Sequence, residues 1–215
     1  MANQTHSAIT DPDIHEPKGV STAASGRVYM SDGAGSGTWL RPMDLVATGD
    51  SVTSSGVEIT GLEIYSELIL VTETVNSGVD DKFFGVQLYS QSGAAYRSSA
   101  TDYLTTYNSR GEDKDEDNVN FAALMVGRTY NNSRLYLTAI TRISNFNHAT
   151  IPTSSYSQAM ALNALLTVTA TVPTNEVGHV ATSIATTAEI NSQIKIRLIE
   201  DLTFTRFYYS LWGIR

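Results

Sequence analysis

The chain has 215 residues, with 22 acidic and 14 basic side chains, a net charge of -8 and no cysteine. The lack of cysteine excludes disulfides, thiolate metal sites and cysteine nucleophiles, and the acidic balance argues against binding nucleic-acid phosphates through a basic stripe. No apolar run approaches the roughly 20 residues of a bilayer span, and the first six residues lack the basic and apolar regions of a secretory signal. We therefore expect neither a nucleic-acid partner nor membrane insertion.

The N-terminal quarter is predicted to be an extended arm. Residues 1 to 27 show neither a helical nor an alternating apolar period, and Pro12 and Pro17 favour extended conformations in the residues before them. Residues 27–30 are expected to add a short strand, which the Gly- and Ser-rich residues 31–37 close as a turn.

The end of the arm is predicted to be a short turn and a linker. Residues 41–46 are compatible with one helical turn, with Pro42 at its first position. Residues 49–56 are interpreted as a linker. The domain boundary is therefore predicted between an arm of residues 1–56 and a head of residues 57–215.

The head is predicted to consist of β-strands. From residue 57 the apolar residues follow a period of two, and the continuous run of residues 68–71 is typical of a strand buried on both faces. Strand patterns occupy residues 62–75, 84–88, 103–107, 119–126, 135–143, 167–172, 194–198 and 204–214. Residues 158–166 fit a helix as well as a strand, and residues 177–190 have apolar residues at helical spacing but are rich in threonine. We expect an all-β fold, a β-sandwich or jelly-roll head.

Three motifs in the arm resemble one known family. The run of residues 11–20, Asp-Pro-Asp-Ile-His-Glu-Pro-Lys-Gly-Val, is followed by Gly-Arg-Val-Tyr at residues 26–29 and by Gly-Ala-Gly-Ser-Gly-Thr-Trp at residues 33–39. In this order they resemble the N-terminal segment of surface proteins of tailed bacteriophages, the tail fibre or head fibre proteins. Residues 65–70, 141–146 and 207–215 resemble strands of the β-sandwich heads of the same class.

This resemblance implies a structural protein of the virion, assembled in the bacterial cytoplasm as a homotrimer. Its arm would attach to other capsid or tail proteins, and its head would face outward. The attachment residues implied for the arm are Ile14, His15, Glu16, Pro17, Lys18, Gly19, Val28, Tyr29 and Trp39. Self-association is also expected from composition, because few charges and an aromatic C-terminal strand leave apolar area that one sandwich of about 160 residues does not cover.

Two short motifs invite an enzymatic interpretation. The glycines of residues 33–37 resemble a phosphate-binding loop, but no Gly-Lys-Ser/Thr ending follows, so a turn is favoured. Gly49-Asp50-Ser51 resembles the nucleophile block of lipase-like hydrolases, which need an Asp-x-x-His partner motif. The nearest match is Glu176 to His179, so a linker turn is again favoured.

Metal sites have weak candidates, and no cofactor is expected. Asp113, Asp115 and Asp117 have the every-second-residue spacing of calcium ligands. Asn118 and Leu124 stand where an EF-hand needs Gly and Glu, so a different calcium site stays open beside the favoured interpretation of a solvated acidic loop. The four histidines lie far apart and do not predict a zinc site.

Tyrosines beside predicted loops are the candidates for a receptor- or glycan-binding surface, because aromatic rings with Asn and Ser neighbours suit sugars and proteins. They are Tyr89, Tyr96, Tyr103, Tyr107, Tyr130 and Tyr156. The sequence thus predicts a non-enzymatic adhesin of the virion surface. A polysaccharide-degrading or deacetylating enzyme and a pure capsid cement protein are the alternatives, and two carboxylates could meet from distant strands.

Overall fold

The computed structural model describes most of the head and part of the arm, namely residues 27–31, 37–49, 55–76, 82–110, 122–129, 135–163, 177–198, 204 and 206–215. The chain divides into two compact units, Met1–Asp44 and Leu45–Arg215. The boundary therefore falls before residue 45 and not after residue 56 as predicted from the sequence, because the strand that follows Asp44 pairs within the larger unit.

The smaller unit contains one described hairpin, made of β1 (Val28–Ser31) and β2 (Gly37–Leu40). Tyr29 and Trp39 are directly opposite each other, with ring centroids 5.3 Å apart in an edge-to-face arrangement. Arg27 Nη1 donates a hydrogen bond to the Trp39 carbonyl oxygen at 2.9 Å. The short strand predicted near Val28 is thus confirmed, and an aromatic cross-strand pair stabilises it.

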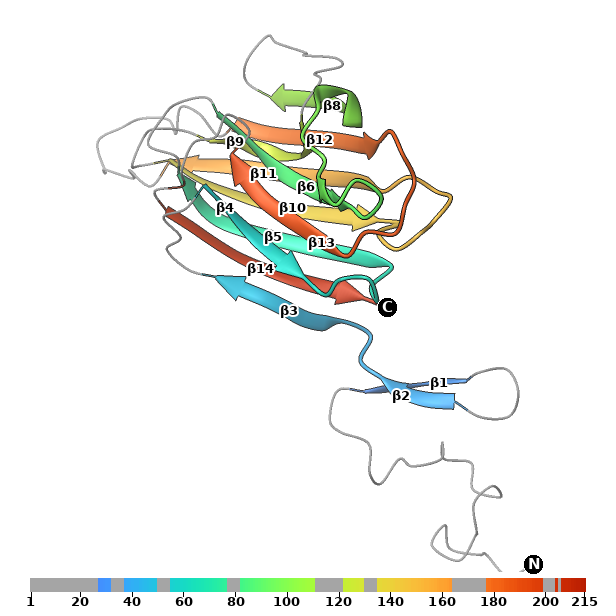
Figure 1. Ribbon diagram of the computed structural model, residues 1–215. Coiled ribbons are helices and arrows are strands. Elements are labelled where there is room, and N and C mark those ends of the chain that lie inside the picture. The colour runs from blue at the N-terminus through green and yellow to red at the C-terminus, as the bar shows by residue number, and fades with distance from the viewer. Residues whose placement is uncertain are drawn as a thin grey trace, which may run out of the picture. The chain divides into compact units, whose positions relative to one another are not determined.

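The larger unit contains two sheets (Figure 1). The seven-stranded sheet has the order β3 (Asp44–Gly49), β14 (Arg206–Ile214), β5 (Glu67–Asn76), β10 (Leu135–Ser144), β11 (Ser154–Asn163), β12 (Val177–Ala185) and β8 (Tyr103–Arg110). The five-stranded sheet has the order β4 (Gly56–Thr60), β13 (Gln193–Leu198), β6 (Lys82–Ser90) and β7 (Ala95–Tyr96), with β9 (Leu124–Thr129) also paired to β6.

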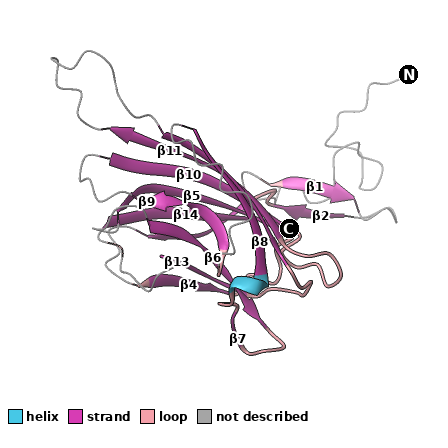
Figure 2. Cartoon of the chain, turned by 90° about the horizontal axis from the view of Figure 1, so that it is seen from above, coloured by secondary structure: helices cyan, strands magenta, loops and turns pink. Residues whose placement is uncertain are grey.

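The two sheets form two layers with the apolar core between them, as Figures 1 and 2 show. Strand alternation builds this core: on β13 Ile194, Ile196 and Leu198 are buried, and on β5 Leu68 and Leu70 are buried. The all-β, sandwich-like architecture predicted from period-two patterning is confirmed, and the jelly-roll topology stays a prediction. None of the described residues forms a helix that is long and apolar enough to cross a membrane.

Buried hydroxyl groups on the inner face of the large sheet hydrogen-bond to β9. Ser183 Oγ accepts a bond from the Met125 backbone N–H at 3.0 Å, and Ser157 Oγ donates to the Val126 carbonyl oxygen at 2.6 Å. Thr105 donates to Ser183 at 2.9 Å. Because an unpaired buried backbone group is costly, these side chains supply the partners that a further strand would otherwise give to β9.

Three segments that are distant in sequence come together in and beside adjacent strands. Residues 65–70, 141–146 and 207–215 lie in or beside β5, β10 and β14, and β5 pairs antiparallel with both neighbours. The Ser66 N–H donates to the Ile214 carbonyl at 2.8 Å, and the Phe146 N–H donates to the Ser66 carbonyl at 2.9 Å. A side chain on Gly213 would come within 2.4 Å of the Tyr65 ring. The three segments therefore belong to one structural unit of the fold.

The helical turn predicted at residues 41–46 is wrong, and the described parts of two segments that the sequence left open between helix and strand form strands. Residues 41–46 do not form a helical turn, because β3 begins at Asp44 and pairs with β14. So short a segment gains too few helical hydrogen bonds to offset nucleation. Residues 177–185 form β12, in which Ala181, Ser183 and Ala185 are buried, and β11 continues as a strand to Asn163. The β-branched residues favour the extended form.

The predicted first head strand is shorter than its apolar run suggests. β5 begins at Glu67, because residues 62–66 form a turn in which Leu62 and Tyr65 contribute to the core. Burial on both faces is also wrong for residues 68–71. Leu68 and Leu70 are fully buried, whereas Ile69 and Val71 are only partly covered.

Candidate functional site

A shallow hollow of about 300 Å³ lies where three loops meet at one end of the five-stranded sheet. We call it the polar hollow. It is lined by Ser90, Ser92, Ala95, Tyr96, Arg97, Ser98, Ser99, Asp102, Thr187 and Glu189. These residues come from the β6–β7 turn, the segment that leads to β8 and the β12–β13 loop, so its walls are far apart in sequence.

The β6–β7 turn brings the first wall into place. Tyr89 pairs with Tyr96 and Ser90 with Ala95, and Ala94 has a positive φ of 49°. A left-handed conformation is uncommon for a residue with a Cβ. Within the turn, the Gly93 N–H donates to Ser90 Oγ at 3.1 Å. The turn thus presents its serine hydroxyls to the polar hollow.

The floor of the polar hollow is an ion pair between Arg97 and Glu189. The Arg97 guanidinium is almost completely buried, and its Nε and Nη2 both donate to Glu189 Oε1, with Nε at 3.1 Å. Its Nη1 donates to the Thr187 carbonyl oxygen at 2.9 Å. Such a buried, multiply bonded charge pair holds two loops in one geometry.

The charge state of Glu189 follows from these contacts. Partial burial alone would raise the pKa of Glu189, but the hydrogen bond and positive charge of Arg97 outweigh it. Hydrogen bonds from Ser90 and Ser92 act in the same direction, and the pKa of Glu189 is lowered from its ordinary value. Glu189 is therefore an acceptor with a fixed negative charge, partly neutralised by Arg97.

Two buried side chains support the floor. Tyr103 accepts a hydrogen bond from the Leu88 N–H at 2.9 Å and donates to the Arg97 carbonyl oxygen at 3.3 Å, and burial raises the pKa of its phenol. Asn191 donates to the carbonyl oxygens of Phe146 at 2.9 Å and Glu189 at 3.0 Å. Both loops that carry the ion pair are thus tied to strands and to the core.

A second carboxylate enters the polar hollow from a short 3-10 turn, η3 (Ala100–Asp102). Asp102 Oδ2 accepts from the Ser99 N–H at 2.9 Å, and the Ser99 side chain accepts from the Asp102 backbone N–H, which together form a capping box. Ser99 Oγ also accepts from the Thr101 N–H at 3.2 Å. One Asp102 oxygen is used in this way. Asp102 is only partly buried, so its carboxylate can also meet a ligand.

Tyr96 forms the aromatic wall. Its ring packs edge-to-face on Tyr89 with centroids 5.3 Å apart, and Lys195 Nζ lies 5.6 Å from its centroid. Its hydroxyl donates to Gln193 Oε1 at 3.4 Å. Burial, together with the charge of Glu58, raises the pKa of Tyr96 to about 12, so the phenol keeps its proton.

These groups are chemically suited to a hydroxyl-rich ligand. The polar hollow offers carboxylate acceptors, several serine hydroxyls and one aromatic wall, and its volume is at the lower limit of the ~300–1,000 Å³ of small-molecule sites. It has room for one sugar residue of a larger chain. A ring over an aromatic side chain with hydrogen bonds around its rim is a common way to bind such a group.

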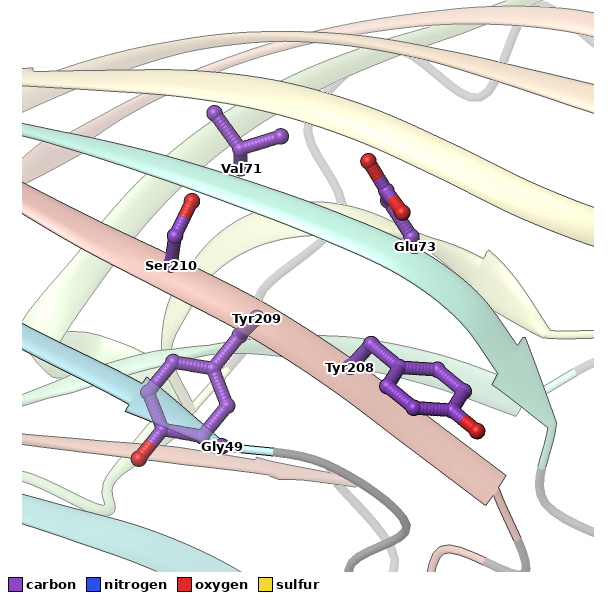
Figure 3. A pocket seen from close by; sticks show the side chains of 6 residues that line it. All are labelled: Gly49, Val71, Glu73, Tyr208, Tyr209 and Ser210. Carbon is purple, nitrogen blue, oxygen red and sulfur yellow. The ribbon is translucent and has the colours of Figure 1, made fainter.

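A second hollow, of about 230 Å³, lies on the seven-stranded sheet (Figure 3). Val71 and Glu73 of β5 stand beside Ser210 and Tyr208 of β14, their cross-strand partners. Tyr209 lies against Gly49, where a Cβ would come within 2.3 Å of the ring. Gly49 of the Gly-Asp-Ser motif is therefore a packing glycine. Asp50 and Ser51 lie outside the described residues.

The attachment residues predicted in the arm are only partly described. Ile14, His15, Glu16, Pro17, Lys18 and Gly19 lie outside the described residues. Tyr29 and Trp39 form the aromatic pair of the hairpin, and Val28 is exposed beside it. This hairpin therefore has an exposed aliphatic side chain available for a partner.

The predicted binding tyrosines lie in different environments. Tyr96 lines the polar hollow, and Tyr89 packs edge-to-face on the Tyr96 ring without lining the hollow itself. Tyr103 and Tyr107 are wrong as exposed candidates, because both are buried on the inner side of β8. Tyr156 is exposed on the outer face of the seven-stranded sheet, away from the other two. Tyr130 lies outside the described residues.

The acidic loop with Asp113, Asp115 and Asp117 also lies outside the described residues. Within the described ranges, no group of three or more His, Asp or Glu side chains is placed to hold a metal ion. The sequence did not single out Arg97, Asp102 or Glu189. The only sequence signal was the dense run of serines around one arginine in residues 90–99, since Glu189 reaches the site from a loop about 90 residues away.

Comparisons with protein-family models, with curated proteins and with solved structures gave no match for this chain.

Proposed function

We propose that this chain is a structural surface protein of a tailed-phage virion, a trimeric fibre or capsid decoration protein whose head binds host-surface glycans. The arm would attach it to capsid or tail proteins. The observation that carries the adhesive role is the polar hollow, where Tyr96, Asp102 and the Arg97–Glu189 pair converge on one exposed, preorganised surface. Adhesion in this proposal requires no cofactor and no catalysis.

Two further observations support a place on the virion. The arm motifs resemble those of phage fibre proteins, and the three head segments with the same resemblance lie in and beside the adjacent strands β14, β5 and β10. Because adjacent strands of one sheet must keep a common register, their joint resemblance supports a shared head framework. The polar hollow lies outside those strands, so its ligand is argued from its own residues.

The binding mechanism follows from a rigid floor and a polar rim. Arg97 and Glu189 are already paired, so a sugar hydroxyl meets groups that need little reordering. A shallow site of this kind gives weak affinity for each sugar. Several heads on one particle bind together, and their effective concentration raises the overall affinity by ~10²–10⁴.

The enzymatic alternative is a polysaccharide-degrading head, favoured by the two carboxylates, Asp102 and Glu189, in one hollow. A glycosidase acid needs a raised pKa to hold its proton at neutral pH. The pKa of Glu189 is lowered instead, and Asp102 caps the turn at Ser99. The chemistry of these groups therefore favours binding over bond cleavage.

A binding assay with purified host-surface polysaccharide tests the adhesive role. We expect Tyr96→Ala to weaken binding about tenfold, or ~1.4 kcal/mol, and Asp102→Asn to weaken it as well. Ile190→Ala is the matched control, because Ile190 is exposed in the same loop as Glu189 and does not line the polar hollow. Equal binding by all four proteins would refute this site, and release of sugar fragments by the unchanged protein would favour the enzyme.

Imaging tests the place on the virion. The gene is deleted from the phage, the particles are compared by cryo-electron microscopy, and adsorption to host cells is measured. Lost density with reduced adsorption supports an adhesin, on the capsid or the tail according to where density disappears. Lost density with unchanged adsorption supports a cement protein, and unchanged density contradicts a virion role.

A further inference from the structure

The outward side of the seven-stranded sheet is unusually apolar. Along β5, Leu68 and Leu70 point into the core, so Ile69 and Val71 point outward. The strand register carries this outward side across the sheet, because cross-strand partners share a face. We call the outward side of β5, β10, β11, β12, β8 and β14 the apolar face.

Large exposed side chains from four strands gather on this face. Ile140 of β10 is opposite Val71, and Leu104 of β8 is opposite Ile184 of β12. The most exposed members are Leu104 at 56%, Ile140 at 56%, Tyr156 at 44%, Ile184 at 40% and Val180 at 39%. Single exposed apolar residues are ordinary, but several large ones on the same sheet face indicate an interaction surface.

Charges on the face are few, and two of them are paired with each other. The charged side chains described on its outward side are Glu67, Glu73 and Arg142, with Arg206 at the start of β14. Arg142 bonds Glu67 through Nε–Oε1 at 2.5 Å and Nη2–Oε2 at 2.7 Å. A pair that is already satisfied can be covered with a smaller desolvation penalty than a lone charge.

The area of the face matches a stable protein interface. The six strands of the face lie about 4.8 Å apart, and the longer ones have nine or ten residues of about 3.3 Å each, so the face measures about 24 by 30 Å, or about 700 Å². Stable interfaces cover about 800 Å² on each partner. The hollow beside Val71 and Ser210 adds a recess of about 230 Å³ on the same face, which a protruding side chain can fill (Figure 3).

We infer that the apolar face is the surface through which copies of this chain associate. Homomeric interfaces are more apolar than transient ones, and a face with few charges, of which Arg142 and Glu67 are paired, offers little to steer a charged foreign partner. This inference rests on the proposed function only for the number of copies, because the apolar face would be the surface buried between the subunits of the proposed trimer. The polar hollow stays outside this surface and open to ligand.

The first experiment measures the mass of the purified full chain by sedimentation equilibrium and multi-angle light scattering. The unchanged protein is expected to form a defined oligomer, and Ile140→Glu is expected to raise its dissociation constant at least a hundredfold, because it places a carboxylate within the apolar contact. Thr60→Glu is the matched control, since Thr60 is an exposed strand residue of the five-stranded sheet. Circular dichroism checks that each variant is folded.

A second experiment uses the absence of cysteine from the chain. Ile140→Cys and Thr60→Cys each introduce one thiol, and their rates of reaction with a maleimide are compared. Cys at position 140 is expected to react at least tenfold more slowly at high protein concentration than at low concentration. Cys at position 60 is expected to react equally fast at both. This readout does not require a disruptive substitution.

The outcomes separate this inference from the proposed function. A monomer at every concentration, or an oligomer unaffected by Ile140→Glu with a fully reactive thiol at position 140, overturns the apolar face as the association surface. A dimer or trimer lost in Ile140→Glu supports it, and three copies agree with the proposed fibre. If the oligomer forms through this face but the protein is absent from virions, the proposed function fails and the apolar face stands.

Discussion

The outer faces of the two sheets differ although their inner faces follow the same alternation. On β13 the outward residues Lys195 and Arg197 are charged, and Lys195 Nζ contacts Glu58 Oε1 at 2.9 Å on the neighbouring strand β4. On β10 and β12 the outward positions include Ile140 and Ile184. An outward charge keeps a sheet face in water, and an outward aliphatic row needs a partner. The comparison therefore identifies the face that the proposed self-association would cover.

The Arg97–Glu189 pair lies at one end of the sheet with the charged outer face, and breaking that pair has the largest expected effect on stability. Arg97→Ala removes a nearly buried guanidinium and leaves the Glu189 carboxylate and the Thr187 carbonyl without it. We expect a loss of about 3 kcal/mol in the free energy of unfolding. Urea denaturation followed by circular dichroism measures it.

The control is Arg142→Ala, which removes a largely exposed arginine from the other sheet. Its cost is expected to be below about 1 kcal/mol. Equal losses for the two variants would contradict the distinction between a buried structural pair and a solvated one.

Acid gives a second, smaller test of the same pair. The pKa of Glu189 is lowered in the folded protein from its ordinary value of 4.5. The stabilisation that Glu189 contributes is therefore complete above about pH 4.5 and declines as the pH falls through the lower folded pKa. Glu189→Gln is expected to flatten this part of the stability profile. A wild-type and variant profile that decline in parallel below pH 4.5 would show that other carboxylates govern acid unfolding.

Much of the fold was predictable from alternation, because each inward row of apolar residues reports directly on the core. Ile194, Ile196 and Leu198 gave β13 in this way. The environment of outward positions was harder to predict, because Ile140 and Ile184 fit a strand pattern whether they face water or a partner. Buried hydroxyls such as Ser157 and Ser183 were also missed. Their inward position depends on β9, whose backbone they bond.

The candidate site was predictable only where its residues are close in sequence. Tyr89 and Tyr96 were found as aromatic residues near a turn, and they pair across the β6–β7 hairpin. Glu189 depends on a contact between loops about 90 residues apart, for which no local pattern exists. Tyr103 was misassigned because a tyrosine beside a serine-rich loop resembles a surface residue, whereas its hydroxyl is satisfied inside by Leu88 and Arg97.

A further variant gives the outer face of the five-stranded sheet the apolar character of the other sheet. Glu58→Leu with Lys195→Leu removes an exposed ion pair, so the free energy of unfolding is expected to change by less than about 1 kcal/mol. Association should change more, because a second apolar sheet face now reaches solvent. We expect larger particles in light scattering, beyond the oligomer of the unchanged protein. An unchanged mass would show that outward aliphatic residues do not by themselves promote association in this fold.

The smallest expected effect on the single chain is that of Ile140→Thr. Ile140 is more than half exposed, so its side chain contributes little to the core, and threonine is equally suited to a strand. The free energy of unfolding, measured in urea at a protein concentration low enough to dissociate the oligomer, is expected to change by less than about 0.5 kcal/mol. The dissociation constant of the oligomer should still rise severalfold. In the unchanged protein, association removes the apolar side chain of Ile140 from water, and the smaller, more polar threonine gains less from being covered. If the single chain were destabilised as much as by a core substitution, Ile140 would belong to the fold and not to an interface. Substitution at the apolar face would then change the free energy of unfolding as well as association, unlike the expected effect of the substitutions at Glu58 and Lys195.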